Sequence, residues 1–428
     1  MLIQFRVENH RSLRDEQTFS FVGTSDKSGA HVLRAEGLDE AVVPVVAIYG
    51  ANASGKSNVL EALAFFRRAV VDSQRRWEVE GTPHEPFLLS GKSKEPSLYE
   101  VDIAVHGVRF RYGFQLSASR IEEEWLFAWP HGRKALWFER DGDRFEFGKT
   151  LHGENEVIRS LTRPNSLFLS AAAQSNHAAL MPLVRHFAAW QVAPSGRGSM
   201  LGLPHDTTRL IRVVDALNES TERESILRLL QAADTGIVGL STAPGADGVR
   251  YSSIWFRHRA TEQDYGWLPL FVESAGTIAL LELAPSILDA LRDGGLLCID
   301  ELEASLHPAL ALGVVRLFND SEHNPKGAQL VFTTHDTNML GSVVGEPVLR
   351  RDQVWFTEKD EAGATHLYPL TDFHPRKEEN LERGYLQGRY GAIPFLGELV
   401  GTALDEPGGD HPTAQNLKDD KPNGDKVG

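Results

Sequence analysis

Alternation of apolar and polar residues predicts antiparallel strands in two parts of the chain. Residues 2–8 and 17–21 alternate on either side of a short polar turn, which predicts a β-hairpin whose first strand is of the edge type. Between residues 98 and 148, alternating runs are separated by turn pairs such as His106-Gly107 and Asp141-Gly142, which indicates an antiparallel meander. The sequence therefore predicts an antiparallel β lobe inserted between other elements.

Short runs that are apolar throughout predict strands buried on both faces, as in a parallel sheet. Such runs occupy residues 42–48, 296–299 and 329–332. Two further strands, with some polar residues, are predicted at 353–357 and 366–370. Helical spacing of apolar residues begins at Ser57, dominates residues 155–235 and returns over 278–290, where Pro285 predicts a kink. A further short β segment is expected from 249 to 255. The mixture predicts an α/β chain.

These changes of pattern divide the chain into five predicted parts. They are the N-terminal part of a core (1–72), the β lobe (73–150), a helical insertion (151–240), the C-terminal part of the core (241–400) and a tail (401–428). The tail is rich in Gly, Pro, Asp, Asn and Lys and has almost no apolar residue after Leu404. Such a segment buries too little apolar surface to offset its ordering entropy, so we expect the tail to be disordered.

Composition restricts the class of protein. The 428 residues are 41% hydrophobic and 24% charged, which is typical of a soluble globular protein. No apolar run is long enough for a membrane helix, the first residues are not a secretory signal, and the single cysteine, Cys298, excludes an intrachain disulfide. We therefore expect a cytoplasmic protein without membrane contact. The net charge of −15 disfavours a surface that coats nucleic acid, although a local basic groove stays open.

The octapeptide Gly50–Ser57 lies between the predicted strand at 42–48 and the helix that follows, and it fits the phosphate-loop pattern G-x-x-x-x-G-K-[ST]. Backbone N–H groups of such a loop close around phosphate oxygens at a helix N-terminus. Lys56 supplies a positive charge for the β- and γ-phosphates, and the Ser57 hydroxyl is a ligand for Mg²⁺. We expect ATP and Mg²⁺ as cofactors. The predicted nucleotide-binding residues are Gly50, Asn52, Ala53, Ser54, Gly55, Lys56, Ser57 and Asn58.

Two candidate catalytic residues follow buried strands. Asp300 and Glu301 come directly after residues 296–299, where Asp300 is suited to hold Mg²⁺ and Glu301 to deprotonate the attacking water. His335 follows the next strand, at the edge where parallel sheets bind ligands, and is suited to contact a γ-phosphate or that water. The alternatives are an acidic pair at a helix start and a structural histidine.

Ser274 and Gly276 precede the predicted helix at 278–290. Small residues at this place make either an anion-accepting helix N-terminus or a simple N-cap.

Together these motifs resemble an ABC-type ATPase head, in the branch that includes the SMC, RecF and OLD-like proteins. Glu273–Thr277 resembles the signature motif of that branch, and Asp300-Glu301 resembles its Walker B motif. Ser305-Leu306-His307 resembles the D-loop, and His335 the switch histidine. The resemblance implies the fold class of a P-loop NTPase head, with the β lobe and the helical stretch as insertions.

The opening segment Phe5–Leu13 is similar to the first strand and turn of the same branch. By this resemblance Asn9 and Arg11 approach the nucleotide. Gln174 is interpreted in the same way as the Q-loop glutamine, a ligand of Mg²⁺.

Two segments near the C-terminus resemble a more specific family within this branch. Arg351–Asp360 and Gly384–Pro394 are similar to the closing segments of RloA-like, abortive-infection-type AAA ATPases. The D-loop has His307 where transporters usually carry Asp, and Glu273 and Thr277 stand in place of Leu and Gln in the signature. These differences argue against a transporter subunit.

The resemblance implies a homodimer or higher homo-oligomer in which two heads enclose two ATP molecules. Each γ-phosphate would contact Lys56 of one subunit and Ser274 and Gly276 of the other. The implied function is an ATP-hydrolysing switch in abortive-infection defence against phage, acting with a separate protein effector encoded nearby. The alternative is a RecF- or SMC-like DNA-repair or DNA-end-binding ATPase. A self-contained nuclease is disfavoured because the last acidic cluster lies in the tail.

Overall fold

The computed structural model describes residues 1–24, 32–34, 40–130, 132–192, 205–233, 236–243, 253–259, 265–304, 306–341, 347–376 and 379–393. These residues belong to one compact unit, Met1–Ile393, and the domain boundaries predicted within it stay a prediction. The predicted tail, Ser305 and residues 249–252 of the predicted β segment lie outside the described residues.

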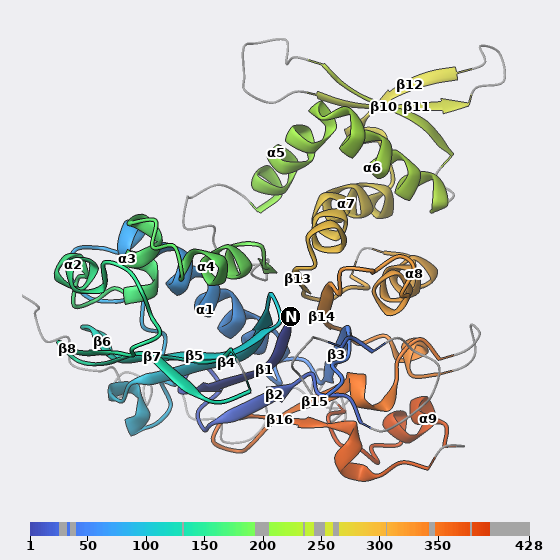
Figure 1. Ribbon diagram of the computed structural model, residues 1–428. Coiled ribbons are helices and arrows are strands. Elements are labelled where there is room, and N and C mark those ends of the chain that lie inside the picture. The colour runs from blue at the N-terminus through green and yellow to red at the C-terminus, as the bar shows by residue number, and fades with distance from the viewer. Residues whose placement is uncertain are drawn as a thin grey trace, which may run out of the picture. The chain divides into compact units, whose positions relative to one another are not determined.

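The predicted N-terminal hairpin and the predicted meander form one antiparallel sheet, in the order β2-β1-β4-β5-β6-β7-β8 (Figure 1). The strands are β1 (Leu2–Glu8), β2 (Gln17–Ser20), β4 (Ser97–Val105), β5 (Val108–Leu116), β6 (Ile121–Trp129), β7 (Ala135–Asp141) and β8 (Arg144–Phe147). The prediction that the first strand is an edge strand is wrong, because β1 pairs with both β2 and β4. Its polar positions are accommodated across the sheet, where Arg6 pairs with Glu100 of β4 at 2.8 Å.

A second sheet has the order β16-β15-β3-β14-β13-β9. Its strands are β3 (Val45–Gly50), β9 (Gln191–Val192), β13 (Leu296–Ile299), β14 (Gln329–Thr333), β15 (Val354–Lys359) and β16 (Thr365–Pro369). All neighbours are parallel except β15 and β16. Every residue of β3, β13 and β14 is buried, as the apolar runs predict. The carboxyl ends of β3, β14 and β13 therefore meet at one edge of this sheet.

In its described residues, the predicted helical stretch at 155–235 contains five helices, α2 to α6, with β9 and short non-helical connections between them. The helices are α1 (Lys56–Arg76), α2 (Asn155–Leu161), α3 (Phe168–Gln174), α4 (Met181–Ala188), α5 (His205–Asn218), α6 (Ser220–Ala232), α7 (Ala275–Asp293), α8 (Pro308–Asn319) and α9 (Leu381–Leu386). Helix α7 runs on through Pro285. A third sheet, antiparallel and not predicted as such, consists of β10 (Ile237–Ala243), β11 (Ser253–Arg259) and β12 (Tyr265–Pro269).

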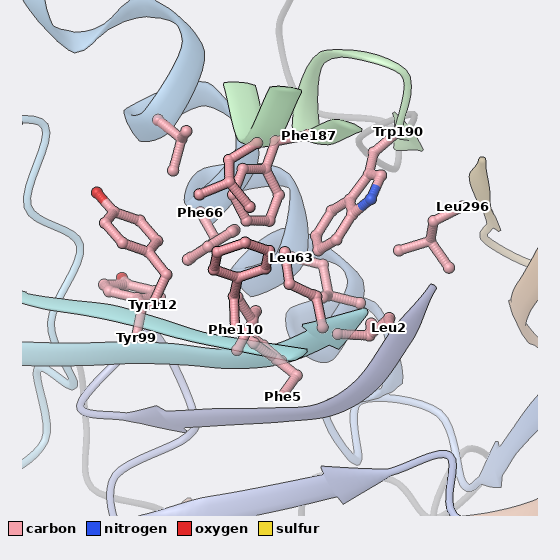
Figure 2. Packing of buried hydrophobic residues seen from close by; sticks show 14 of the residues in the cluster. Leu2, Phe5, Leu63, Phe66, Tyr99, Phe110, Tyr112, Phe187, Trp190 and Leu296 are labelled. Carbon is pink, nitrogen blue, oxygen red and sulfur yellow. The ribbon is translucent and has the colours of Figure 1, made fainter. Parts of the chain in front are cut away.

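Helix α1 is packed into the core between α3, α4 and the seven-stranded sheet (Figures 1 and 2). The predicted apolar face of this helix is buried, and Phe66 lies at its centre. The ring of Phe66 is 5.7 Å from that of Phe114 on β5 and 5.2 Å from that of Phe187 on α4. Full burial of a phenylalanine side chain stabilises the folded state by about 1.5–3 kcal/mol. The helix that begins at the phosphate loop is therefore held firmly at its middle.

The two larger sheets are joined at Gln329, the first residue of β14. Its side-chain oxygen accepts a hydrogen bond from the backbone N–H of Leu2 at 2.5 Å, and its amide donates to the Leu2 carbonyl at 2.8 Å. Gln329 is buried, so both of its polar groups depend on this contact. The first residues of β1 are thereby fixed to the start of β14.

Candidate nucleotide site

The phosphate loop between β3 and α1 has no space for side chains at its two glycines. A Cβ atom on Gly50 would lie 2.5 Å from Oγ1 of Thr357, and one on Gly55 would lie 2.1 Å from Oγ1 of Thr365. Gly55 also has a φ of 105°, which favours glycine. Ala53 adopts a left-handed conformation as well, with a φ of 62°. The loop is therefore pressed closely against β15 and β16.

Hydroxyl groups from three elements hold the loop in this position. Ser54 shares a hydrogen bond of 2.7 Å with Thr357, and Thr365 donates to the Ser54 carbonyl at 2.8 Å. Asn58 donates to the Ser12 hydroxyl at 2.5 Å, which lies 2.7 Å from that of Thr365. The predicted binding residues Ser54 and Asn58 thus have protein partners. Thr357, Thr365 and Ser12 were not predicted, because their roles depend on contacts between distant segments.

The loop opens into a cavity of 1480 Å³, here called the phosphate-loop cavity. Predicted residues that line it are Arg11, Asn52, Ala53, Gly55, Lys56, Ser57, Asn58, Asp300, Glu301 and His335. The middle of α7, the strands β9 and β13, and the segment from His84 to Leu89 also contribute, together with Ser12, Arg212, Lys359 and Gly363. The structure therefore brings together residues that lie far apart in the sequence.

The Lys56 amine bends back over the loop. Its Nζ donates hydrogen bonds to the carbonyls of Gly50 at 2.9 Å and Ala51 at 3.1 Å, and the residue is only 6% exposed. Burial lowers the pKa of Lys56, whereas the nearby charges of Asp300 and Glu301 oppose that shift. Gly55 stands at the N-cap of α1, where it offers no side chain to the first helical N–H groups. A buried cation beside these N–H groups makes a site suited to an anion.

The residues suited to Mg²⁺ are already in contact. The Ser57 hydroxyl donates to Asp300 at 2.9 Å, and the Thr333 hydroxyl donates to the other oxygen of the same carboxylate at 2.6 Å. Thr333 also accepts a hydrogen bond of 2.8 Å from the backbone N–H of Glu301. The Ser57 hydroxyl at the start of α1 and the Asp300 carboxylate directly after β13 are hard oxygen ligands, so this pair fits Mg²⁺. Thr333 was not predicted, although its position at the end of the strand before His335 was available as a signal.

Glu301 and His335 reach the cavity from neighbouring strand ends. Glu301 has a φ of 50° and an exposed side chain, and it directly follows Asp300. Burial and the charge of Lys56 lower the pKa of His335, so the imidazole is neutral near pH 7. Neutral imidazole offers one donor and one acceptor. The pair is placed to contact a terminal phosphate and a water beside it.

Asn9 does not line the cavity. It is 1% exposed, and its amide donates to the carbonyls of Lys92 at 2.8 Å and Glu95 at 2.9 Å. Its side-chain oxygen accepts from the N–H of Phe87 at 3.0 Å. Direct contact between Asn9 and a nucleotide is therefore not supported, since the side chain is occupied by protein partners. Arg11, by contrast, lines the cavity as expected.

Gln174 also lies elsewhere, at the end of α3, and is not among the residues lining the cavity. The glutamine that does line it is Gln191 on β9, which pairs in parallel with β13 and accepts a hydrogen bond of 2.6 Å from Arg212. The interpretation of Gln174 as a Mg²⁺ ligand is therefore not supported. Gln191 was missed because a two-residue strand leaves little pattern, although the Gly- and Pro-containing residues after it indicate a strand end.

Ser274 and Gly276 stand at the N-terminus of α7 and do not line the cavity of their own chain. Ser274 caps the helix, where its hydroxyl accepts from the N–H of Thr277 at 3.1 Å. Just before it, Trp267, Phe271 and Val272 have large exposed fractions, and Phe271 reaches 83%. Ser274 is therefore the simple N-cap that was given as the alternative. Exposed apolar side chains lie just before it in the sequence.

The comparisons with known proteins identify one family. Residues 45–341 match the family described as "AAA domain, putative AbiEii toxin, Type IV TA system". No curated protein matches the chain. In the described residues, no helix has both the length and the apolar character needed to cross a membrane.

Three solved SMC head structures are similar to the chain. The SMC head domain from Thermotoga maritima is 14% identical with a TM-score of 0.41, covering 86% of this chain and 98% of its own. An SmcHead bound to the C-winged helix domain of ScpA is 14% identical with a TM-score of 0.45, covering 87% and 99%. An Smc head with an extended coiled coil, bound to the C-terminal domain of ScpA derived from Pyrococcus furiosus, is 13% identical with a TM-score of 0.38, covering 91% and 98%.

The predicted α/β fold with a phosphate loop is confirmed, and the family match identifies an AAA domain. The phosphate-loop strand β3 lies beside β14, which His335 follows, and β14 lies beside β13, which Asp300 directly follows. The match to the AAA family covers β3, β9, β13 and β14 of this sheet but not β15 and β16, which lie after residue 341. The chain belongs to the AAA-domain family described as "putative AbiEii toxin, Type IV TA system".

Proposed function

We propose that the chain hydrolyses ATP and uses the ATP-bound state as a switch. The observation that carries this proposal is the convergence of Lys56, Ser57, Asp300, Glu301 and His335 on one cavity. Lys56 would leave the loop carbonyls to bind β- and γ-phosphate oxygens, a step eased by its position directly over the loop. Mg²⁺ held by Ser57 and Asp300 would neutralise charge on the same phosphates.

Glu301 is the proposed general base. Its side chain is exposed to the cavity next to Asp300, which suits a group that must reach a water in line with the γ-phosphate. The backbone N–H of Glu301 is held by Thr333, so the base is positioned from the same hydroxyl that orients Asp300. Neutral His335 would hydrogen-bond the γ-phosphate from the adjacent strand.

Closure between two copies of the chain is the proposed consequence of ATP binding. Ser274 and Gly276 do not line their own cavity, and the N-terminus of α7 is suited to an anion held by a second copy. The exposed Phe271 and Val272 beside it would be buried by such a contact. Hydrolysis would then reopen the pair.

The biological role that we infer is that of a cytoplasmic switch in abortive-infection defence, acting on a separate protein effector. It is supported by the family description, which links this AAA domain to the toxin of a toxin–antitoxin system. The net charge of −15 favours a protein partner over nucleic acid.

The test compares wild type with Lys56→Ala and Glu301→Gln in ATP hydrolysis and in size measurements with and without ATP. We expect Lys56→Ala to lose nucleotide binding, and Glu301→Gln to bind ATP, lose hydrolysis and accumulate as a dimer. Lys149→Ala and Glu146→Gln, two exposed residues on or near β8, are the matched controls. Equal hydrolysis in Lys56→Ala and wild type would refute the site. Tight, salt-sensitive and ATP-dependent binding of DNA would favour the repair ATPase instead.

A further inference from the structure

Two exposed leucines, Leu88 and Leu89, line a part of the phosphate-loop cavity that has no role in the proposed phosphate chemistry, here called the apolar end. Leu88 and Leu89 line it with exposed fractions of 76% and 74%, in a segment that is neither helix nor strand. The residue before them, Phe87, is 2% exposed. Single exposed leucines need no explanation, but two adjacent ones in the cavity that also contains Lys56 do.

Polar contacts fix the backbone that carries these leucines. The Asn9 side chain bonds to the N–H of Phe87 on one side and to the carbonyls of Lys92 and Glu95 on the other. Arg11 binds Glu85 twice, through its backbone N–H to the Glu85 carbonyl at 2.8 Å and through its guanidinium to the carboxylate. The segment is therefore held before and after Leu88 and Leu89, and both side chains are exposed in this backbone conformation.

The turn between β15 and β16 lies next to Leu89 at the apolar end. A Cβ atom on Gly363 would lie 2.9 Å from Cδ1 of Leu89, so the turn and the leucine are in close contact. Gly363 and Lys359 line the cavity together with Leu88 and Leu89. Thr365, just after the turn, bonds to the phosphate loop and to Ser12. The turn that contacts Leu89 is therefore followed directly by a residue that is hydrogen-bonded to the phosphate loop.

We infer that Leu88 and Leu89 form the contact surface for the nucleobase of the bound nucleotide. This inference rests on the proposed nucleotide binding at Lys56. The cavity lining combines Lys56 and the hydroxyl of Ser57 at the phosphate loop with Arg11, Ser12 and the exposed side chains of Leu88 and Leu89, which suits a ligand with a phosphate part and an apolar ring. A flat purine ring laid on two leucines removes apolar surface of both from water, which favours binding. Asn9 acts as a positioning residue for this surface and does not touch the nucleotide.

The test is calorimetric titration of the full chain with Mg²⁺·ADP and with Mg²⁺·pyrophosphate, which lacks the base. We expect the double variant Leu88→Ser, Leu89→Ser to bind ADP about 10-fold more weakly, equivalent to about 1.4 kcal/mol. Its affinity for pyrophosphate should equal that of wild type, which also shows that the phosphate loop is intact. Leu161→Ser, at an exposed leucine on α2, is the matched control and should change neither affinity.

Three results would overturn the inference. They are unchanged ADP affinity in the double variant, equal weakening of ADP and pyrophosphate, and weakening of ADP by Leu161→Ser to the same extent. If the double variant unfolds, the single variants Leu88→Gln and Leu89→Gln replace it under the same criteria. Failure of the proposed function is separate, because wild type would then bind neither ligand, or Lys56→Ala would bind both as wild type does.

Discussion

Thr333 provides the sharpest test of how the candidate site is assembled. Its hydroxyl donates to Asp300 at 2.6 Å and accepts from the N–H of Glu301 at 2.8 Å, in a residue with no exposed surface. Thr333→Val keeps the shape of the side chain and removes both hydrogen bonds. Thr333→Ser keeps the hydroxyl and removes only a methyl group, so it is the matched control.

The expected loss in the free energy of unfolding follows from the two hydrogen bonds that Thr333→Val removes. A hydrogen bond to a charged group contributes about 1.5–3 kcal/mol, and a buried N–H left unpaired costs about 1–3 kcal/mol. Because Asp300 keeps its bond to Ser57, we expect the free energy of unfolding to fall by about 3 kcal/mol in Thr333→Val, near the lower end of the sum of these two ranges. In Thr333→Ser we expect a fall of about 1 kcal/mol, for the lost methyl group.

Thr333→Val should also weaken the binding of Mg²⁺, and more strongly than the loss of stability alone suggests. Removing a partner that orients a metal ligand typically weakens metal binding about 10- to 100-fold. We therefore expect Thr333→Val to need at least about 10-fold more Mg²⁺ for half-maximal ADP binding, whereas Thr333→Ser should resemble wild type. Urea unfolding and Mg²⁺ titrations of ADP binding measure the two quantities. The reasoning is refuted if the valine and serine variants match in both.

Three further predictions concern the loop and its support. Gly55→Ala places a Cβ against Thr365, so we expect loss of ADP binding in calorimetry, whereas Gly313→Ala, with open space around it, should bind normally. Asn9→Ala should lower the free energy of unfolding in urea by about 2–3 kcal/mol, because buried backbone groups lose their partners. Burial lowers the pKa of His10 to about 3, so stability is lost as pH falls below about 6.5, by about 2 kcal/mol at pH 5. In urea titrations at pH 7 and pH 5, His10→Phe should lack that part of the pH dependence.

The parts of the site that could be predicted are those whose local backbone demands particular residues. A phosphate loop needs Gly50 and Gly55 at fixed spacing, and the acidic pair after a buried strand is visible at Asp300 and Glu301. The residues that hold these groups were not predicted. Thr333 and Thr365 look like ordinary strand residues until the register of distant strands brings them to the site.

In the fold, too, strands with a clear pattern in their own sequence could be predicted, whereas the positions of strands that depend on distant partners could not. Apolar runs predicted β3, β13 and β14 well, because burial on both faces leaves an unmistakable pattern. The position of β1 inside its sheet was not predictable, since its partner β4 lies about 95 residues later and its polar residues are satisfied across the sheet. The third sheet was missed apart from residues 253–255 of the predicted β segment, which lie in β11, because β12 is only five residues long and β10 comes soon after a helical pattern.

The pair of hydrogen bonds between Gln329 and Leu2 has a consequence for how the chain responds to heat. It ties the first strand to β14, while α1 links the phosphate loop to the aromatic core around Phe66. The two larger sheets should therefore melt together rather than in sequence. A nucleotide present at 100 times its dissociation constant adds about 2.7 kcal/mol to the folded state. That increment would then be shared by the entire assembly, and a single calorimetric peak would move upward without splitting.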